Sequence, residues 1–143
     1  MQSAKKKSVG FLITTTANLL NNTINNELRI HKIAIEQRAI LEIIELKKEI
    51  KQSDLTNILG KDKTTISRTL KSLENKNFVI KEKINNKTFI LRLSKLGEKV
   101  LIETKDIVDN FREKILLEFT QKELDDLYIY LEKIQNIIIK EKD

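Results

Sequence analysis

The chain has 143 residues, of which 40% are hydrophobic and 34% charged, a composition that favours one folding unit. It contains no cysteine, which excludes disulfide bonds, thiolate metal sites and cysteine-based redox sensing. Residues 47–99 hold 14 Lys or Arg against 6 Asp or Glu, a balance of +8, whereas the remainder has a balance of −2. This basic middle favours phosphate binding, although a lysine-rich surface also arises for solubility alone.

The apolar pattern argues against a membrane or exported protein. The longest apolar runs, such as residues 11–13 and 137–139, are far short of the roughly 20 residues that cross a bilayer. Residues 1–7 include three consecutive lysines, but the stretch that follows is interrupted by polar residues and has no small-residue cleavage signature. We therefore expect a soluble, cytoplasmic protein with no membrane partner.

Apolar spacing predicts helices along most of the chain, at residues 9–30, 36–46, 52–59, 96–119 and 120–140. Two short signals mark helix ends: Gly60 for a left-handed C-cap, and Thr120 with Glu123 for a capping box. In the short helix 52–59, the side chains expected inside are Leu55, Ile58 and Leu59. The long terminal helices are too apolar for so small a domain to cover, which favours burial against a second copy over packing within the chain.

A further helix is predicted from Asp62, which can cap it, to about Asn77. On a helical wheel its buried side carries Ile66, Leu70 and Leu73. The opposite side carries hydrogen-bonding and cationic side chains without an acid, namely Thr64, Arg68, Lys71 and Asn75. Such a row suits the major groove of DNA, while the alternative is an ordinary polar helix face.

Two β-rich segments, 78–84 and 88–93, flank Asn85-Asn86, residues that tolerate a tight hairpin turn. A two-residue loop would pair Ile80 with Leu91 and Phe78 with Leu93. The other face of the hairpin would then carry Lys81, Lys83 and Arg92. The order short helix, turn, helix, basic hairpin predicts a mainly helical, winged helix-turn-helix fold.

Five motifs carry a resemblance to a known family, namely Asp54-Leu55, Leu59-Gly60, Thr64-Thr65-Ile66-Ser67-Arg68, Leu73-Glu74 and Leu93-Ser94-x-x-Gly97. Through them, and over almost the whole chain, the sequence resembles the multiple-antibiotic-resistance regulator (MarR) family. It implies a repressor or activator that binds double-stranded DNA as a homodimer. As one domain over residues 1–143, the chain would comprise dimerisation helices at 8–31 and 106–141, a winged helix-turn-helix at 35–100, a recognition helix at 63–76 and a wing at 78–93.

The resemblance also implies the residues that contact DNA. In the recognition helix these are Lys63, Thr64, Thr65, Ser67, Arg68 and Lys71; Gln52 and Ser53 would touch phosphates; and the wing would add Lys83, Asn85, Asn86 and Lys87. The sequence departs from the family at three places. The wing is short and has Asn85-Asn86-Lys87 in place of an Asp-x-Arg element, so it should add affinity more than specificity. Asn77 replaces a glycine and should still form a left-handed cap, and Lys51 replaces a capping Ser or Thr, so the helix after it would start late, at a Ser53 cap.

A small-molecule effector pocket between the dimer arm and the winged domain is implied as well. His31, the one histidine, is the candidate ligand-binding residue, although a solvated or hydrogen-bonded structural role is the commoner one. We expect no metal, no cofactor and no catalytic activity. The alternatives are a winged-helix module for protein interaction or general nucleic-acid binding, and a helical interaction protein whose wing has no function.

Overall fold

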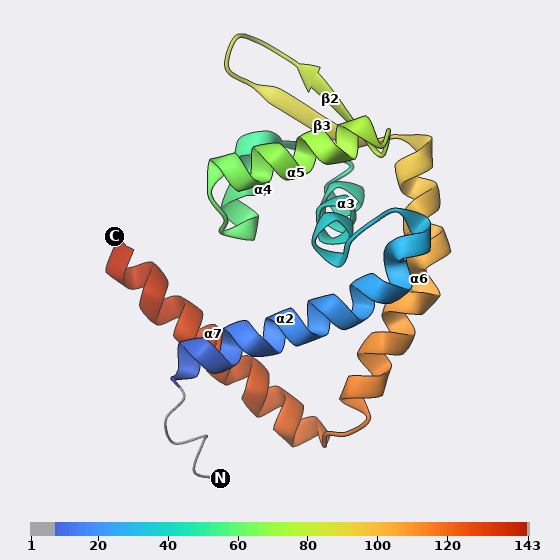
Figure 1. Ribbon diagram of the computed structural model, residues 1–143. Helices are drawn as coiled ribbons and strands as arrows, with labels where there is room; N and C mark the ends of the chain where they lie inside the picture. Colours follow the sequence, from blue (N-terminus) through green and yellow to red (C-terminus); the bar gives the residue numbers. More distant parts are fainter. Residues whose placement is uncertain (1–7, 143) are drawn as a thin grey trace. The chain divides into compact units, whose positions relative to one another are not determined.

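The structure, a computed structural model, describes residues 8–142 (Figure 1). The lysine-rich segment used to argue against export, residues 1–7, lies outside the described residues. The helices are α2 Val9–Leu28, η1 Arg29–His31 (3₁₀), α3 Ile35–Lys47, α4 Gln52–Leu59, α5 Lys63–Asn75, α6 Lys95–Leu116 and α7 Gln121–Lys142; the strands are β1 Glu49–Lys51, β2 Val79–Lys83 and β3 Phe89–Leu93. The fold is thus mainly helical with a small antiparallel sheet, as the sequence predicts.

The chain forms two compact units that divide between Ile107 and Val108, within α6. The core of the first unit is built from α3, α4, α5 and β3. Its fully buried side chains include Leu41, Ile44, Leu55, Ile66, Leu70, Leu73 and Leu91. Three of them, Ile66, Leu70 and Leu73, form the buried side of α5 that the wheel predicts, so the opposite side of α5 faces solvent.

A buried arginine joins two helices of this unit. Arg38 in α3 is only 5% exposed, and its Nε donates to Thr104 Oγ1 at 2.7 Å. A second guanidinium nitrogen donates to the Leu101 carbonyl at 3.0 Å, and a third contact pairs the group with Glu42. Because a buried guanidinium is tolerated only when its donors are satisfied, this network fixes α3 against the first half of α6.

The sheet has the order β1-β3-β2, and its first strand was not expected. Strand β1 has three residues, too few to show an alternating pattern, and it pairs Ile50 with Leu91 on the free edge of β3. In the hairpin, Ile80 pairs with Arg92 and Lys81 with Leu91, so the predicted register is wrong by one residue. The reason is a three-residue loop: the N–H of Ile84 donates to the Thr88 carbonyl at 2.9 Å and encloses residues 85–87.

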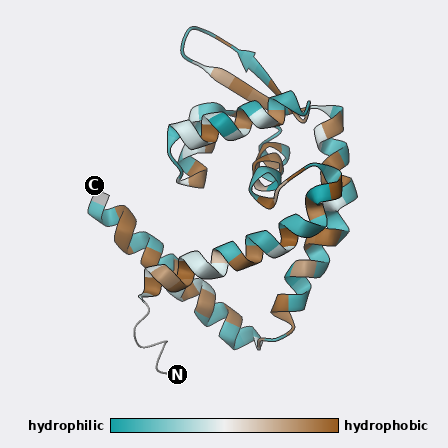
Figure 2. Ribbon diagram, in the orientation of Figure 1, coloured by the Kyte–Doolittle hydropathy of each residue, from teal (hydrophilic) through white to brown (hydrophobic). Residues whose placement is uncertain are grey.

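The second unit contains the end of α6 and all of α7. Thr120 and Glu123 form the expected capping box, since Thr120 N–H donates to Glu123 Oε1 at 2.9 Å and Glu123 N–H to Thr120 Oγ1 at 3.1 Å. Hydrophobic residues recur along α7 (Figure 2). Within the described residues, no helix combines the length and hydrophobicity that crossing a membrane would need.

Candidate nucleic-acid interface

The turn between α4 and α5 is set by two local signals. Gly60 closes α4 with φ 67°, and its N–H donates to the Thr56 carbonyl. Asp62 caps α5, because its carboxylate accepts from the Thr65 N–H at 2.8 Å and from the Thr65 hydroxyl at 3.0 Å. These hydrogen bonds, the backbone one first, lower the pKa of Asp62 below its ordinary 3.8. The turn therefore fixes where α5 begins and which side of it faces outward.

The outward side of α5 gathers the side chains expected to read DNA. A shallow hollow of about 380 Å³ is lined by Lys63, Thr64, Ser67, Arg68 and Lys71. All five were predicted DNA contacts, all five are exposed, and none is acidic. Among residues 8–142, neither Arg68 nor Lys71 has an ion-pair partner, so both cations are available to a ligand. The surface offers guanidinium, ammonium and hydroxyl donors on one helix face.

Two other predicted contacts, Thr65 and Asn85, have local hydrogen-bond partners. Thr65 is half-buried and donates its hydroxyl to the carboxylate of the Asp62 cap. Asn85 accepts the Lys87 N–H at 3.0 Å and shapes the hairpin loop, while Asn86 is exposed at its tip. Thr65 and Asn85 therefore stabilise the local structure, whether or not they also contact DNA.

The hairpin separates its charges by face. Because Val79 pairs with Leu93 and Lys83 with Phe89, the lysines at 81 and 83 share the face of buried Val79 and Leu91. Within that face, Lys81 Nζ lies 4.3 Å from the centre of the Phe89 ring. Arg92, expected beside these lysines, lies instead on the opposite face.

On that opposite face, Arg92 pairs with Glu82 at 2.8 Å and with Glu49 of β1 at 3.7 Å. The guanidinium is thus occupied by two carboxylates, one of them on the strand that the sequence did not reveal. The one-residue register change places Arg92 on the face opposite Lys81 and Lys83. The cations on the face of Lys81 are therefore lysines and include no arginine.

A second hollow, of about 570 Å³, lies between α4, α5 and the hairpin. It brings together Gln52, Ser53, Lys63, Ser67 and Lys87, five predicted contacts. It also contains residues that sequence reasoning missed, namely Lys51, Thr56, Asn57, Thr88 and Phe89. For Lys51, the sequence did contain a signal for this position, because the residue directly precedes the helix whose first residues were expected to touch phosphates.

The start of α4 corrects one expectation. The helix begins at Gln52 and its N-cap is Lys51, with no side-chain hydrogen bond to the cap, so Ser53 does not cap a later start. In contrast, Asn77 takes the left-handed conformation expected of it, with φ 64°.

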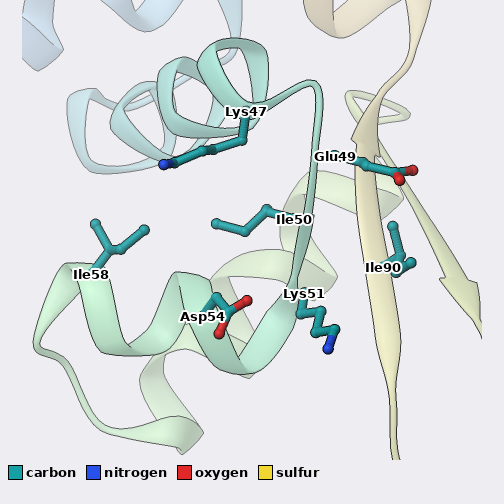
Figure 3. A pocket seen from close by; sticks show the side chains of 7 residues that line it. All are labelled: Lys47, Glu49, Ile50, Lys51, Asp54, Ile58 and Ile90. Atoms are coloured by element: carbon teal, nitrogen blue, oxygen red, sulfur yellow. The ribbon is translucent and has the colours of Figure 1, made fainter.

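A third hollow, of about 420 Å³, lies against α4 and β1 and has a different chemistry (Figure 3). Its rim mixes Lys47 and Lys51 with Glu49 and Asp54, so it carries no net charge for an anion. Ile58, expected inside the core, is 53% exposed and faces this hollow. The mixed charge sets this surface apart from the cationic face of α5.

His31 lies in a further hollow of about 540 Å³ at the end of α5. The lining is Ile30, His31, Lys32, Lys76, Phe78, Leu96, Lys99, Val100 and Glu103, with three lysines and one acid. His31 Nδ1 lies 3.8 Å from Glu103 Oε2. Burial lowers the pKa of Lys76, whose Nζ donates to Gln37 Oε1 at 2.9 Å.

The first comparison with known proteins concerns sequence. Residues 33–87, which run from the start of α3 to the hairpin loop, match the model of the MarR family. No curated protein sequence matches the chain.

Solved structures give the second comparison. The S. aureus MepR–DNA complex shares 17% identity over 93% of this chain and 99% of its own, with a TM-score of 0.84. An E. coli MarR variant complexed with operator DNA shares 20% identity over 88% of this chain and 92% of its own, with a TM-score of 0.79. An uncharacterized SlyA-like transcription regulator from Listeria monocytogenes shares 28% identity over 94% and 91%, with a TM-score of 0.82. The shared fold therefore extends beyond the matched domain to nearly the whole chain.

Proposed function

We propose that this chain is a sequence-specific DNA-binding repressor of the MarR family and not an enzyme, because residues 33–87 match the model of that family. It would bind a pseudo-palindromic operator in the cytoplasm as a homodimer and leave it when a small molecule binds. One observation carries the proposal: the exposed face of α5 gathers Lys63, Arg68 and Lys71 with two hydroxyl groups and without any acid.

On the operator, α5 would lie in the major groove. Arg68 is suited to guanine, since its planar guanidinium can donate two parallel hydrogen bonds to O6 and N7. Thr64 and Ser67 beside it would bond base edges or phosphates, and Lys71 would neutralise the backbone. The family resemblance and the DNA complexes of two structural neighbours support this placement.

The proposed homodimer is supported by apolar residues left exposed on a single chain. On α2 these include Val9 at 60%, Phe11 at 51% and Leu19 at 69%. On α7 they include Leu131, Ile137, Ile138 and Ile139. Burial of side chains of this size against a second copy stabilises association by the hydrophobic effect.

The proposed effector would bind in the hollow beside His31. A small organic anion with an apolar body suits its lining, because His31 and three lysines line the hollow together with apolar residues such as Phe78. Lys76, which follows α5, would transmit the change, because it is bonded to Gln37 of α3. If no small aromatic or aliphatic carboxylate shifts the DNA affinity of the wild type more than that of the Lys76→Gln variant, this effector site is wrong.

The test of sequence-specific reading is the Arg68→Ala variant, measured by fluorescence anisotropy on an operator duplex and on a duplex of random sequence. Loss of a bidentate guanine contact should cost about 1 to 3 kcal/mol on the operator and little on random DNA. The matched control is Lys71→Ala, which should weaken both complexes. Equal losses on both duplexes for Arg68→Ala would instead favour general nucleic-acid binding.

A further inference from the structure

The hollow between α4, α5 and the hairpin carries only positive charge, like the hollow on the outward side of α5 and unlike the hollows beside β1 and His31, which also contain acidic residues. Three of its lining residues are cationic, Lys51, Lys63 and Lys87, and none is acidic. The remaining polar ones are the neutral Gln52, Ser53, Thr56, Asn57, Ser67 and Thr88. A positive, hydrogen-bonding concavity without carboxylates is suited to an oxyanion.

The three lysines reach this hollow from separate elements, each held by its own backbone. Lys51 ends β1, paired with Ile90, and its extended φ of −70° and ψ of 142° make it the N-cap of α4. Lys63 is the first residue of α5, directly after the Asp62 cap. Lys87 closes the hairpin loop with its N–H bonded to Asn85. The convergence therefore follows from the fold and not from one flexible segment.

The start of α4 adds unused hydrogen-bonding capacity at the same place. No side chain caps this helix, so its first N–H groups, at Gln52 and Ser53, have no side-chain acceptor among the described residues. The Oε1 atom of Gln52 is buried and likewise has no donor there. A buried amide oxygen without a donor is energetically costly. Rotation of the amide would put its NH₂ group in that place, where it can donate to an oxygen of a ligand, so a ligand with acceptor oxygens is favoured.

We propose that Lys51, Lys63 and Lys87 together bind one backbone phosphate of DNA in this hollow, which we name the phosphate seat. The inference rests on the proposed DNA binding and adds to it that the helix-turn-helix and the wing share a single phosphate. Lys87 then contacts the same phosphate as the lysines at the starts of α4 and α5. The short wing can therefore bind DNA without entering a minor groove. Lys51, outside the expected contacts, becomes a DNA-binding residue.

The salt dependence of binding distinguishes a shared phosphate from three separate ones. Each neutralised phosphate contributes about 0.9 to the slope of log K against log salt. If the lysines share one phosphate, replacing one of them leaves that phosphate neutralised by the other two. Affinity then falls several-fold while the slope changes by well under 0.9 per protomer, and only the triple variant loses about 0.9.

The experiment measures the slope with a 30-base-pair duplex of mixed sequence, so that it does not depend on the operator; this length is about three helical turns. The variants are Lys51→Gln, Lys63→Gln, Lys87→Gln and the triple. The control, Lys71→Gln, lies outside the seat and should lose about 0.9 by itself, additively with the triple. Because all four lysines are exposed, thermal unfolding should be unchanged.

Three results would overturn the proposal. Slope losses near 0.9 for each single variant, about 2.7 in the triple, would mean that the lysines bind separate phosphates; DNA binding itself would stand. If the three lysines leave the slope untouched but inorganic phosphate at matched ionic strength binds and is lost in the triple variant, the seat belongs to a free anion. A wild-type protein that binds no duplex would overturn the seat and the proposed function together.

Discussion

Asp62 determines where α5 begins, and its ionisation should be visible in the stability of the protein. The Thr65 N–H and hydroxyl stabilise the carboxylate, which lowers its pKa from 3.8. A carboxyl group with a depressed folded-state pKa stabilises the fold above its unfolded value. That contribution is lost as pH falls through the lower, folded value.

The Asp62→Asn variant should therefore keep its helix cap and lose part of the acid sensitivity, because asparagine caps without a charge. Asp62→Ala should lower the melting temperature at neutral pH, since it removes the cap altogether. Thermal unfolding of the three proteins between about pH 6 and pH 2.5 measures both effects. Parallel pH profiles for the wild type and Asp62→Asn would contradict this account of the cap.

Single residues were predicted well where one conformation dominates. Gly60 and Asn77 take the expected left-handed backbone, and Asp62 caps as expected, because these preferences are local. Lys51 shows the limit: without a Ser or Thr the helix still begins at Gln52, since β1 pairing fixes the preceding chain. The seat around Lys51 could not be foreseen, because its members meet only in the folded unit.

Among the elements, the β2–β3 hairpin has one face with the lysines at 81 and 83 and an opposite face where Arg92 is paired with carboxylates. Arg92 is held by Glu82 and Glu49, whereas Lys83 is exposed on the face of Lys81. Arg92→Gln should therefore change the affinity for any duplex by no more than about twofold. Lys83→Gln should weaken all duplexes several-fold and reduce the salt slope. A larger loss for Arg92→Gln than for Lys83→Gln, with both variants folded by circular dichroism, would show that the faces are assigned wrongly.

The hairpin also shows why elements are easier to predict than their pairing. Both strands follow from their β-rich composition, but Asn85-Asn86 fits a two-residue loop and a three-residue loop equally well in sequence. The observed loop includes Lys87, bonded to Asn85, and this single residue moves Arg92 to the other face. The pairing of β1 depends on the exposed edge of β3, which no local pattern encodes.

At the scale of the whole molecule, the apolar surface of α7 should control assembly. Ile138 is 49% exposed in the single chain, and a charge there would oppose burial in the proposed dimer. Ile138→Glu should give a monomer at micromolar concentration in sedimentation velocity. Its operator affinity should fall at least tenfold, because a dimer that contacts both half-sites binds far more tightly than a monomer that contacts one.

The matched control for this variant is Asn136→Glu, which adds the same side chain on the other side of α7. It should remain dimeric and keep its operator affinity. A monomeric wild type, or a dimer that tolerates both substitutions, would contradict the assembly. The long helices could be predicted from periodicity, but the identity of their partner could not, because exposed apolar residues do not specify what covers them.

The central claim is that the chain reads DNA as a two-fold dimer through the exposed face of α5. Selection of bound sequences from a random duplex library tests this claim directly, because the library contains every candidate half-site. The wild type should enrich a two-fold symmetric motif with half-sites about 10 base pairs apart, and Arg68→Ala should abolish this enrichment. No enriched motif, or one without symmetry that Arg68→Ala leaves unchanged, would contradict the claim.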